Sequence, residues 1–498
     1  MEELPDEVVS NIFGRISSSS GRNTVALVCS RFYDLERCQR DHLRVGCGLH
    51  PARPALRSLC SRFPFLTTVE VLYAGWMSKL GKQVDDEGLT ILATHCTYLR
   101  DLSLSFCSFI TDVGLSNLAG CSRLTALRLN FTPGITGRGL LSLVAGCKKI
   151  SILHLTRCLN VSSVEWLEFL GHHGNLESLA IRNCRGIGEG DLAKLGPGGW
   201  GKLQELVFEV DANHRYMKVF GHLAAESSCH HFHTDCAALR VLSFTNCLTT
   251  PGRGLACVLV KCQALTELHL DMCIGLRDDD LVPLARNSPF LRSLSLRIPS
   301  DFSMSIRLCS PPRLTDSSLK AIARHCSYLE KVAISFADGE FPLFSSFTVE
   351  GILALVEGCS FLRVLVLDRA YSFNDSGMEA LCFSQSLEVL ELVQCQEVSD
   401  EGLKCIRSSN LKDIRLCRCL GISNAGFSSL IGFRSLDMLR VEDCPQITKE
   451  GIEGSAKVHI CKFVLQNTAG YESVSWSQSS LSILNGFDSV KAKFMRLL

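Results

Sequence analysis

The apolar residues of this chain return in one pattern, L-x-x-L-x-L-x-x-C, in which other aliphatic residues can replace leucine. Most copies begin 24 to 27 residues after the previous one, and four longer spacings of 33 to 38 residues mark insertions. Repetition of a unit of one length predicts an array in which each unit packs against its neighbours. Clear copies begin at Leu99, Leu124, Ile150, Leu176, Leu203, Leu239, Leu265, Leu291, Leu329, Leu362, Leu387, Leu411 and Leu436, and degenerate copies begin at Leu66 and Ile460.

Each unit predicts a short strand followed by a helix. Alternating apolar residues such as Leu102 and Leu104 are typical of a strand with one buried face. The next segment, ITDVGLSNLAGC, is amphipathic, and Asp112 or Thr111 can cap its helix.

The first 45 residues follow a different pattern. Pro5 stands before an acidic first turn, and Val8, Val9, Ile12, Phe13 and Ile16 form an apolar helical stripe. The segment SSSSGRN then predicts a loop, and TVALVCSRFYDLERC predicts further helix. About 40 residues in two or three short helices bury little surface. We therefore expect this module to be stabilised by contact with the repeats or with a partner.

Most of the 26 cysteines follow the repeat register. One column closes strands and the other ends helices, which is what space-filling buried thiols would do. A zinc site needs four converging ligands, and a ladder with one cysteine per repeat does not converge. The exception is CHHFHTDC, from Cys229 to Cys236, where zinc is an open alternative. The strand-end column is Cys107, Cys158, Cys184, Cys247, Cys273, Cys395, Cys419 and Cys444, and the helix-end column is Cys96, Cys121, Cys147, Cys236, Cys262, Cys326 and Cys359.

Composition narrows the possible partners. The chain has 51 basic and 51 acidic residues, which argues against general affinity for nucleic acid. Its acidic start is unlike a signal peptide, and no apolar run approaches the length that spans a membrane. We therefore expect an intracellular protein in a reducing compartment, in the nucleus, the cytoplasm or both, with no membrane and no nucleic-acid partner.

The repeats resemble leucine-rich repeats of the cysteine-containing type over about four-fifths of the chain. This resemblance implies an α/β solenoid, a horseshoe with a parallel sheet on its concave face and helices on its convex face. The amino-terminal segment resembles an F-box, through L-P-D-E-V at its front and L-V-C-x-x-F-Y at its back. The implied adaptor-binding residues are Leu4, Pro5, Val8, Ile12, Phe13, Val28 and Cys29.

Together the two resemblances imply a domain order. They place an F-box at residues 1–45, a helical junction at 46–65, about 15 repeats at 66–465 and a C-terminal cap or tail at 466–498. Insertions lie near residues 73–84, 211–238, 299–316 and 337–348. The junction, with its basic helix and R-F-P turn, resembles plant F-box proteins related to the auxin and jasmonate receptors, which bind an inositol phosphate and a small hormone. Such a ligand is an open alternative here.

Strand residues between the buried leucines are expected to face the concave side. They form a basic zone around Arg128, an acidic zone around Glu209 and a second basic zone around Arg415, and such zones can orient a charged partner. The residues that we expect to contact a protein substrate are Arg128, His154, Arg182, Glu209, His269, Asp271, Arg297, Arg415 and Arg440.

The sequence shows no G-x-S-x-G, no H-E-x-x-H and no phosphate-binding glycine loop before a lysine. We therefore expect no catalytic residue, no metal and no cofactor. The resemblance implies a substrate-recognition subunit of a Skp–cullin–F-box ubiquitin ligase, which binds a Skp-type adaptor and, through it, a cullin, so that a bound protein substrate is marked for degradation. The alternatives are a leucine-rich-repeat scaffold outside ubiquitination, or a small-molecule co-receptor.

Overall fold

The computed structural model describes residues 4–16, 18–47, 51–73, 83–211, 236–247, 262–273, 275–299, 314–337, 347–406, 409–430, 433, 435–448 and the backbone of 462–466. The chain divides into two compact units, Met1–Leu362 and Arg363–Leu498, which are described in turn. The cores of the predicted insertions and nearly all of the predicted C-terminal tail lie outside the described residues.

The first unit begins with a module of three helices, α1 (Asp6–Gly14), α2 (Ser19–Ala26) and α3 (Ser30–Gln39). Val9, Phe13 and Phe32 form its core, and the rings of Phe13 and Phe32 meet edge to face with centroids 5.2 Å apart. Ser18 caps α2 by accepting a hydrogen bond from the Gly21 N–H at 3.0 Å.

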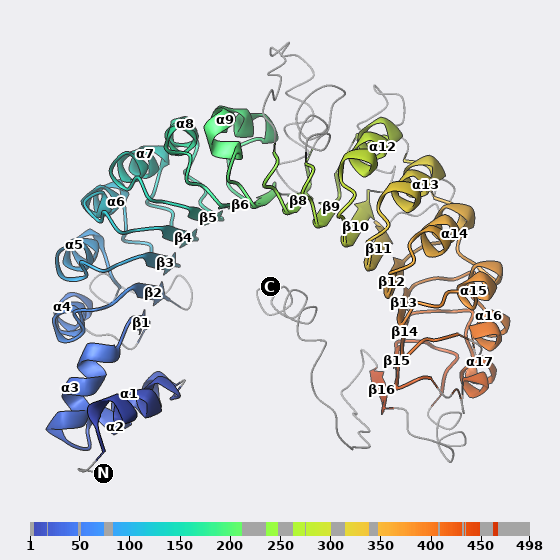
Figure 1. Ribbon diagram of the computed structural model, residues 1–498, viewed down its shortest axis with the longest axis horizontal. Coiled ribbons are helices and arrows are strands. Elements are labelled where there is room, and N and C mark those ends of the chain that lie inside the picture. Colours follow the sequence, from blue (N-terminus) through green and yellow to red (C-terminus); the bar gives the residue numbers. More distant parts are fainter. Residues whose placement is uncertain are drawn as a thin grey trace. The chain divides into compact units, whose positions relative to one another are not determined.

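A parallel sheet follows in the first unit, with strands paired in chain order. Its strands line the inner side of a curved array and the helices cover the outer side (Figure 1). The strands are β1 (His42–Val45), β2 (Thr68–Leu72), β3 (Asp101–Ser105), β4 (Ala126–Asn130), β5 (Ile152–Thr156), β6 (Ser178–Arg182), β7 (Glu205–Glu209), β8 (Val241–Thr245), β9 (Glu267–Asp271), β10 (Ser293–Ile298) and β11 (Lys331–Phe336).

The helices of this array are α4 (Ala52–Arg62), α5 (Asp86–His95), α6 (Asp112–Leu118), α7 (Gly137–Gly146), α8 (Glu165–His173), the 3-10 helix η1 (Glu189–Leu195), α9 (Gly196–Trp200), α12 (Asp278–Asn287), α13 (Asp316–His325) and α14 (Val349–Gly358). The second unit repeats the arrangement with β12 (Val364–Asp368), α15 (Asp375–Leu381), β13 (Val389–Val393), α16 (Asp400–Cys405), β14 (Asp413–Cys417), α17 (Asn424–Ser429), β15 (Met438–Glu442) and β16 (Lys462–Gln466).

The predicted repeat fold is confirmed, with one strand that the repeat pattern missed. Strand β1 pairs in parallel with β2, and Leu43 lies opposite Val69. It precedes the first predicted repeat at Leu66 and lies inside the range predicted for the F-box, so the sheet starts earlier than expected. Its four residues, HLRV, hold only two buried apolar positions, too few to match the repeat pattern.

Strand side chains alternate as the pattern predicts. Leu102 and Leu104 are fully buried, while Asp101, Ser103 and Ser105 are half-buried on the other face. Pairing keeps this alternation in register, because Ser103 lies opposite Arg128 and Arg128 lies opposite His154. The polar rows therefore run across the strands as continuous lines.

Most described strands are followed by a residue whose backbone is in the left-handed conformation. The next residue belongs to the strand-end column. Arg157, with φ 52°, is followed by the buried Cys158. Its backbone N–H donates to the Arg182 carbonyl of the next strand at 2.8 Å, which holds this uncommon conformation in place. Burial raises the pKa of the Cys107 thiol to about 12, so that thiol stays protonated and inert. The cysteines that the structure describes are free thiols.

The starts of successive helices are joined by a contact that we call the carboxylate clasp. Asp112, the first residue of α6, accepts hydrogen bonds from the Thr136 N–H at 2.7 Å and its hydroxyl at 2.6 Å, and Thr136 in turn caps α7. Thr111, not Asp112, caps α6 itself by accepting from the Val113 N–H. The same clasp joins Asp86 to Thr111, Asp278 to Thr315, Asp316 to Thr348, Asp375 to Ser399 and Asp400 to Ser423.

We expect Asp400→Ala to lower the free energy of unfolding by about 2 to 4 kcal/mol, because two charge-assisted hydrogen bonds to Ser423 are lost. Urea unfolding of the full chain measures this change. Glu401→Ala is the matched control, since the Glu401 side chain is 73% exposed. Equal loss of stability in the two variants would contradict the role given to the clasp.

We expect Gly402→Ala to destabilise the protein by about 1 to 3 kcal/mol, the usual range for overpacking. A Cβ at this position would stand 2.4 Å from the Oδ1 atom of Asp375, which holds the preceding clasp. Thermal unfolding measures the effect against Gly120→Ala, where nothing lies within 4 Å of the added carbon. A Gly402→Ala variant as stable as Gly120→Ala would show that the clasp has room to move.

Candidate functional site

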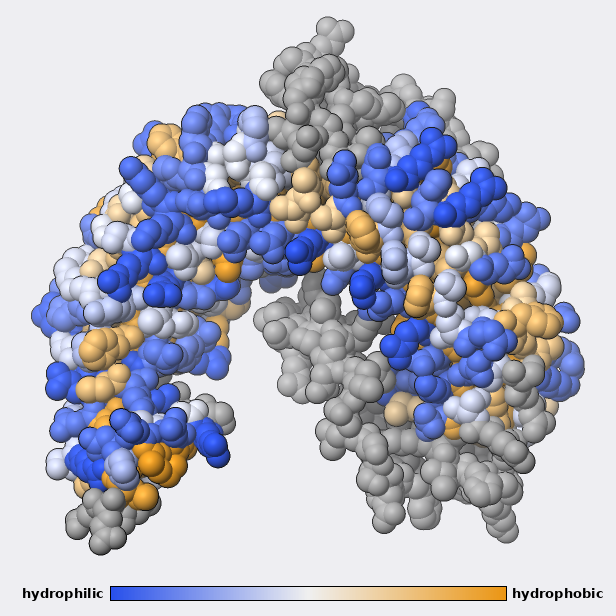
Figure 2. All heavy atoms as spheres, in the orientation of Figure 1, coloured by the Kyte–Doolittle hydropathy of each residue, from blue (hydrophilic) through white to orange (hydrophobic). Residues whose placement is uncertain are grey.

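The N-terminal module exposes an apolar face beside its core. Val8 and Ile12 are spaced four residues apart, so they share one side of α1, and Leu4 lies two residues before the helix. The three side chains are 42%, 46% and 37% exposed in that order. Leu27 and Val28, between α2 and α3, are 83% and 68% exposed. Figure 2 shows apolar residues gathering on this module at the lower left of the view. We call these five residues the amino-terminal patch.

Phe13, one of the predicted adaptor-binding residues, is 3% exposed and belongs to the module core, whereas Val8 and Ile12 on the same helix are exposed. The sequence stripe combined two helix faces, one buried and one exposed. Leu27 was missed, although its place beside Val28 at a helix end was a usable signal.

The other predicted positions lie around the patch. Pro5 is exposed and precedes α1, and Cys29 is exposed and caps α3 by accepting from the Phe32 N–H through its sulfur at 3.4 Å. Arg31 donates to the Asp6 carboxylate at 2.7 Å and to the Leu4 carbonyl, which ties the chain start to α3. The role of these residues in adaptor binding stays a prediction.

Arginine and aromatic side chains join the module to the repeats. The Arg62 guanidinium lies 4.2 Å from the ring centroid of Tyr33 and 4.9 Å from that of Phe63, and Arg40 lies 4.7 Å from the Phe63 centroid. Arg40 also pairs with the buried Glu36. Tyr33, Glu36 and Arg40 come from the module or its end, and Arg62 and Phe63 from the end of α4, so stacking fixes one to the other.

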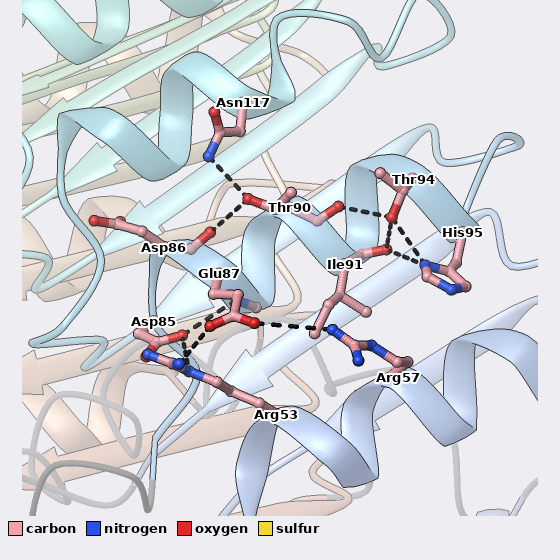
Figure 3. A network of polar contacts seen from close by, with 11 residues as sticks. Arg53, Arg57, Asp85, Asp86, Glu87, Thr90, Ile91, Thr94, His95 and Asn117 are labelled. Atoms are coloured by element: carbon pink, nitrogen blue, oxygen red, sulfur yellow. Dashed lines mark hydrogen bonds and ion pairs between the residues drawn. The ribbon is translucent and has the colours of Figure 1, made fainter.

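Helix α4 is fixed in turn to the first helix of the repeats (Figure 3). Arg53 pairs with Asp85 and Glu87, and Arg57 lies 3.8 Å from Glu87. Within α5 and α6, Asn117 donates to the Thr90 hydroxyl at 2.9 Å. The module, α4 and the first repeats therefore form one connected body in the first unit.

The first basic zone of the concave face carries less positive charge than its residues indicate. Arg128 pairs with Asp101 on the neighbouring strand. Burial and the Arg128 charge lower the pKa of His154, whose Nε2 lies 2.8 Å from the Ser178 hydroxyl. Arg182 is half-buried at the end of β6 and has no ion-pair partner among the described residues.

The acidic zone is partly paired. Glu209 accepts from the Asn183 amide at 2.7 Å, and His269 lies 3.5 Å from Glu267. Asp271 and Arg297 stand 3.9 Å apart, too far for a hydrogen bond, and the Oδ1 atom of Asp271 is buried without one. Burial raises the pKa of Asp271.

The second basic zone lies on the second unit. Arg415 and Arg440 face each other in register on β14 and β15, with Glu391 opposite Arg415 on β13. Arg415 stands 3.8 Å from Glu391 and 3.7 Å from Asp413. Asp413 lies outside the predicted set, because it stands two residues before the concave position that Arg415 occupies. All nine predicted substrate residues lie on polar rows, and their role in binding stays a prediction.

The described residues hold no metal-binding cluster and no helix that could span a membrane. Within the described ranges, no group of three or more His, Cys, Asp or Glu side chains is placed to hold a metal ion. Most of the Cys229–Cys236 segment lies outside those ranges, although Cys236 itself is buried. None of the helices described here has the length and apolarity needed to cross a bilayer.

Comparison with known proteins agrees with this layout. The F-box family model matches residues 1–42, and the leucine-rich repeat model matches residues 95–119 and 383–406. F-box/LRR-repeat protein 12 of Arabidopsis thaliana is 26% identical over 162 residues, which are 32% of this chain and 36% of that protein. F-box protein SKIP1 of Arabidopsis thaliana is 28% identical over 138 residues, which are 26% of this chain and 43% of that protein. The chain thus spans less than half the length of either relative.

Solved structures were compared as well. The crystal structure of the Rad7 and Elc1 complex in yeast has a TM-score of 0.44 and 15% identity, and the match covers 90% of this chain and 95% of that one. With an F-box match at its amino terminus and leucine-rich-repeat matches in two of its strand–helix units, this chain has the architecture of an F-box/leucine-rich-repeat protein.

Proposed function

We propose that this protein is the substrate-recognition subunit of a Skp–cullin–F-box ubiquitin ligase. The amino-terminal patch binds a Skp-type adaptor, which connects the chain to a cullin, and the concave strand face holds a protein substrate. The observation that carries the proposal is the patch itself, which stands on a module that already has a separate core.

The patch is suited to burial by a partner. Its five apolar side chains are between 37% and 83% exposed, although the chain neighbours Val9 and Ala26 are buried. A contiguous apolar face with a polar surround is typical of a protein interface. The F-box match over residues 1–42 supports a Skp-type adaptor as the partner.

The mechanism that we propose is proximity. A bound substrate is held near ubiquitin-transferring subunits, which raises its effective concentration there. Such a mechanism needs a stiff connection between the adaptor site and the repeats, and the Arg62 stack between Tyr33 and Phe63 supplies one. In this proposal the chain contributes no acid, base or nucleophile, and it acts in the nucleus, the cytoplasm or both.

We expect Ile12→Glu to weaken binding to a purified Skp-type adaptor by about 30-fold or more, because a charge replaces an apolar anchor worth roughly 2 kcal/mol. Biolayer interferometry with the full chain measures the affinity. Ile12 is 46% exposed, so the substitution leaves the core intact.

The matched control is Val113→Glu, which places the same charge at a 61% exposed valine on α6. Wild-type affinity in Ile12→Glu, or equal weakening in both variants, would contradict the adaptor site. Failure of the wild-type chain to bind any Skp-type adaptor would favour the alternative of a scaffold outside ubiquitination.

We expect Arg62→Ala to loosen the module from the repeats while adaptor affinity stays unchanged. Two cation–π contacts worth about 0.5 to 1 kcal/mol each are lost, so amide hydrogen exchange should rise in α3 and α4. Arg57→Ala on the same helix is the control, because the Arg57 side chain is 59% exposed. Unchanged exchange in Arg62→Ala would show that the stack is not the connection.

A further inference from the structure

Exposed aromatic side chains form a row on the repeats of the first unit. Phe290, Tyr328 and Phe361 stand in the turns that follow α12, α13 and α14, three helices that lie side by side (Figure 1). Each of these residues directly precedes the first leucine of its repeat, so the three occupy one position in successive units. They are 56%, 46% and 55% exposed. We call these three residues the aromatic edge.

The three rings of the aromatic edge stack on one another. The centroids of Phe290 and Tyr328 are 6.2 Å apart and their planes are 24° from parallel, while those of Tyr328 and Phe361 are 6.0 Å apart and 17° from parallel. About half of each side chain nevertheless remains open to solvent. The rings therefore form a continuous apolar surface with a regular step.

The turn itself does not require an aromatic residue. At the same repeat position, three other turns of the first unit hold the polar residues Lys149, Asn175 and Lys202. Another aromatic residue at this position, Tyr98, is covered by the chain itself, because the Arg123 guanidinium lies 4.4 Å from its ring centroid. Among the described residues, no cation stacks on the aromatic edge. An exposed apolar surface that neither the turn nor the core needs is typical of a protein interface.

The backbone of these turns limits the conformation of a partner. The N–H groups of Leu291, Leu329 and Leu362 already donate to carbonyls three residues earlier, at 3.3, 3.2 and 3.0 Å. They cannot pair with a partner strand, whose own backbone groups would then lose hydrogen bonds on burial. Proline has no N–H, and a polyproline II segment keeps its backbone solvated. Such a segment docks on aromatic side chains through its rings alone.

The length of the aromatic edge suits a short segment of this kind. Polyproline II advances about 3.1 Å per residue, and neighbouring ring centroids are 6.2 and 6.0 Å apart. About five residues in this conformation therefore cover the row from Phe290 to Phe361. The conformation is already populated in free proline-rich chains, so little entropy is lost when it binds.

Unpaired arginines set the charge of the partner. Arg286 and Arg324 stand four residues before Phe290 and Tyr328, in the last turns of α12 and α13. Both are exposed, and neither has an ion-pair partner among the described residues. Glu357 is the exposed residue at the corresponding place on α14, so positive charge is in excess beside the rings. This excess favours carboxylates on the bound segment.

We propose that the aromatic edge binds a proline-rich segment of a partner protein that also carries acidic residues. The proline rings of the segment cover the exposed aromatic side chains, and its carboxylates face Arg286 and Arg324. The aromatic edge shares no residue with the amino-terminal patch or with the predicted substrate residues, so this inference does not depend on the proposed function.

Fluorescence polarisation of the full chain with labelled peptides tests the proposal. The probe is four repeats of Pro-Pro-Glu. One control is four repeats of Pro-Pro-Lys, which reverses the charge, and the other is four repeats of Gly-Ser-Glu, which keeps the charge and removes proline. Wild type should bind the probe at least tenfold more tightly than either control. Absence of binding, equal binding of the three peptides, or a preference for either control would overturn the proposal.

Two variants locate the binding surface. Tyr328→Ser removes the central ring and should weaken binding of the probe at least tenfold, while Tyr98→Ser, at a 39% exposed tyrosine in the same repeat position, should leave it unchanged. Arg324→Glu should also weaken it, whereas Arg138→Glu, at an exposed arginine of α7, should not. Full affinity in Tyr328→Ser or Arg324→Glu, or an equal loss in their controls, would show that the probe binds elsewhere.

Further measurements separate docking from folding and from self-association. Adaptor affinity and melting temperature should stay at wild-type values in Arg324→Glu, because its side chain is exposed, so this variant decides the matter if Tyr328→Ser unfolds. Light scattering examines a second copy of this chain as the occupant. A wild-type dimer that becomes monomeric in Tyr328→Ser, with no binding of the probe, would overturn the proposal.

Discussion

The carboxylate clasp is the constraint from which the geometry of the repeats follows. An aspartate at the start of one helix accepts from the backbone and hydroxyl of the residue that caps the next, as Asp112 does with Thr136. In five of the six clasps described, glycine stands three residues after the capping residue, where a side chain would meet the carboxylate. In the clasp of Asp278, Ser318 takes this place and donates its hydroxyl to the carboxylate. Strand pairing fixes the spacing of repeats on one face, and the clasp fixes it on the other. Together they hold the polar rows of the concave face in lines.

Much of the fold could be predicted because the repeated leucines and cysteines show where each strand and helix lies in its unit. Leu102 and Leu104 mark a buried face, and the columns of Cys107 and Cys96 mark where strands and helices end. Strand β1 could not be predicted this way, since its short sequence carries too few apolar positions to resemble the others. It is held by pairing with β2, which is a tertiary interaction that local pattern does not report.

The binding surfaces were less predictable, for different physical reasons. A helical stripe shows which residues are apolar, but Phe13 and Ile12 differ only in which neighbour covers them. The charge zones were predicted from the number of charged residues in each. The electrostatic field also depends on ion-pair partners such as Asp101, which neutralises Arg128. Asp413 begins its strand, and its burial beside Arg415 follows from packing that the sequence pattern does not report.

The left-handed residues at the strand ends have a consequence for how such a surface can diversify. Their backbone is held by a hydrogen bond to the next strand and by the buried residue that follows, so side chains of different chemistry occupy the same turn. The non-glycine residues described at this position are Phe, Arg, Asn, Met, Gln and Asp. None of them is β-branched. The side chain at these positions can therefore change while the turn is kept. A lineage of related chains could exchange charge for aromatic character there, one repeat at a time, and acquire new partners while the scaffold beneath stays the same.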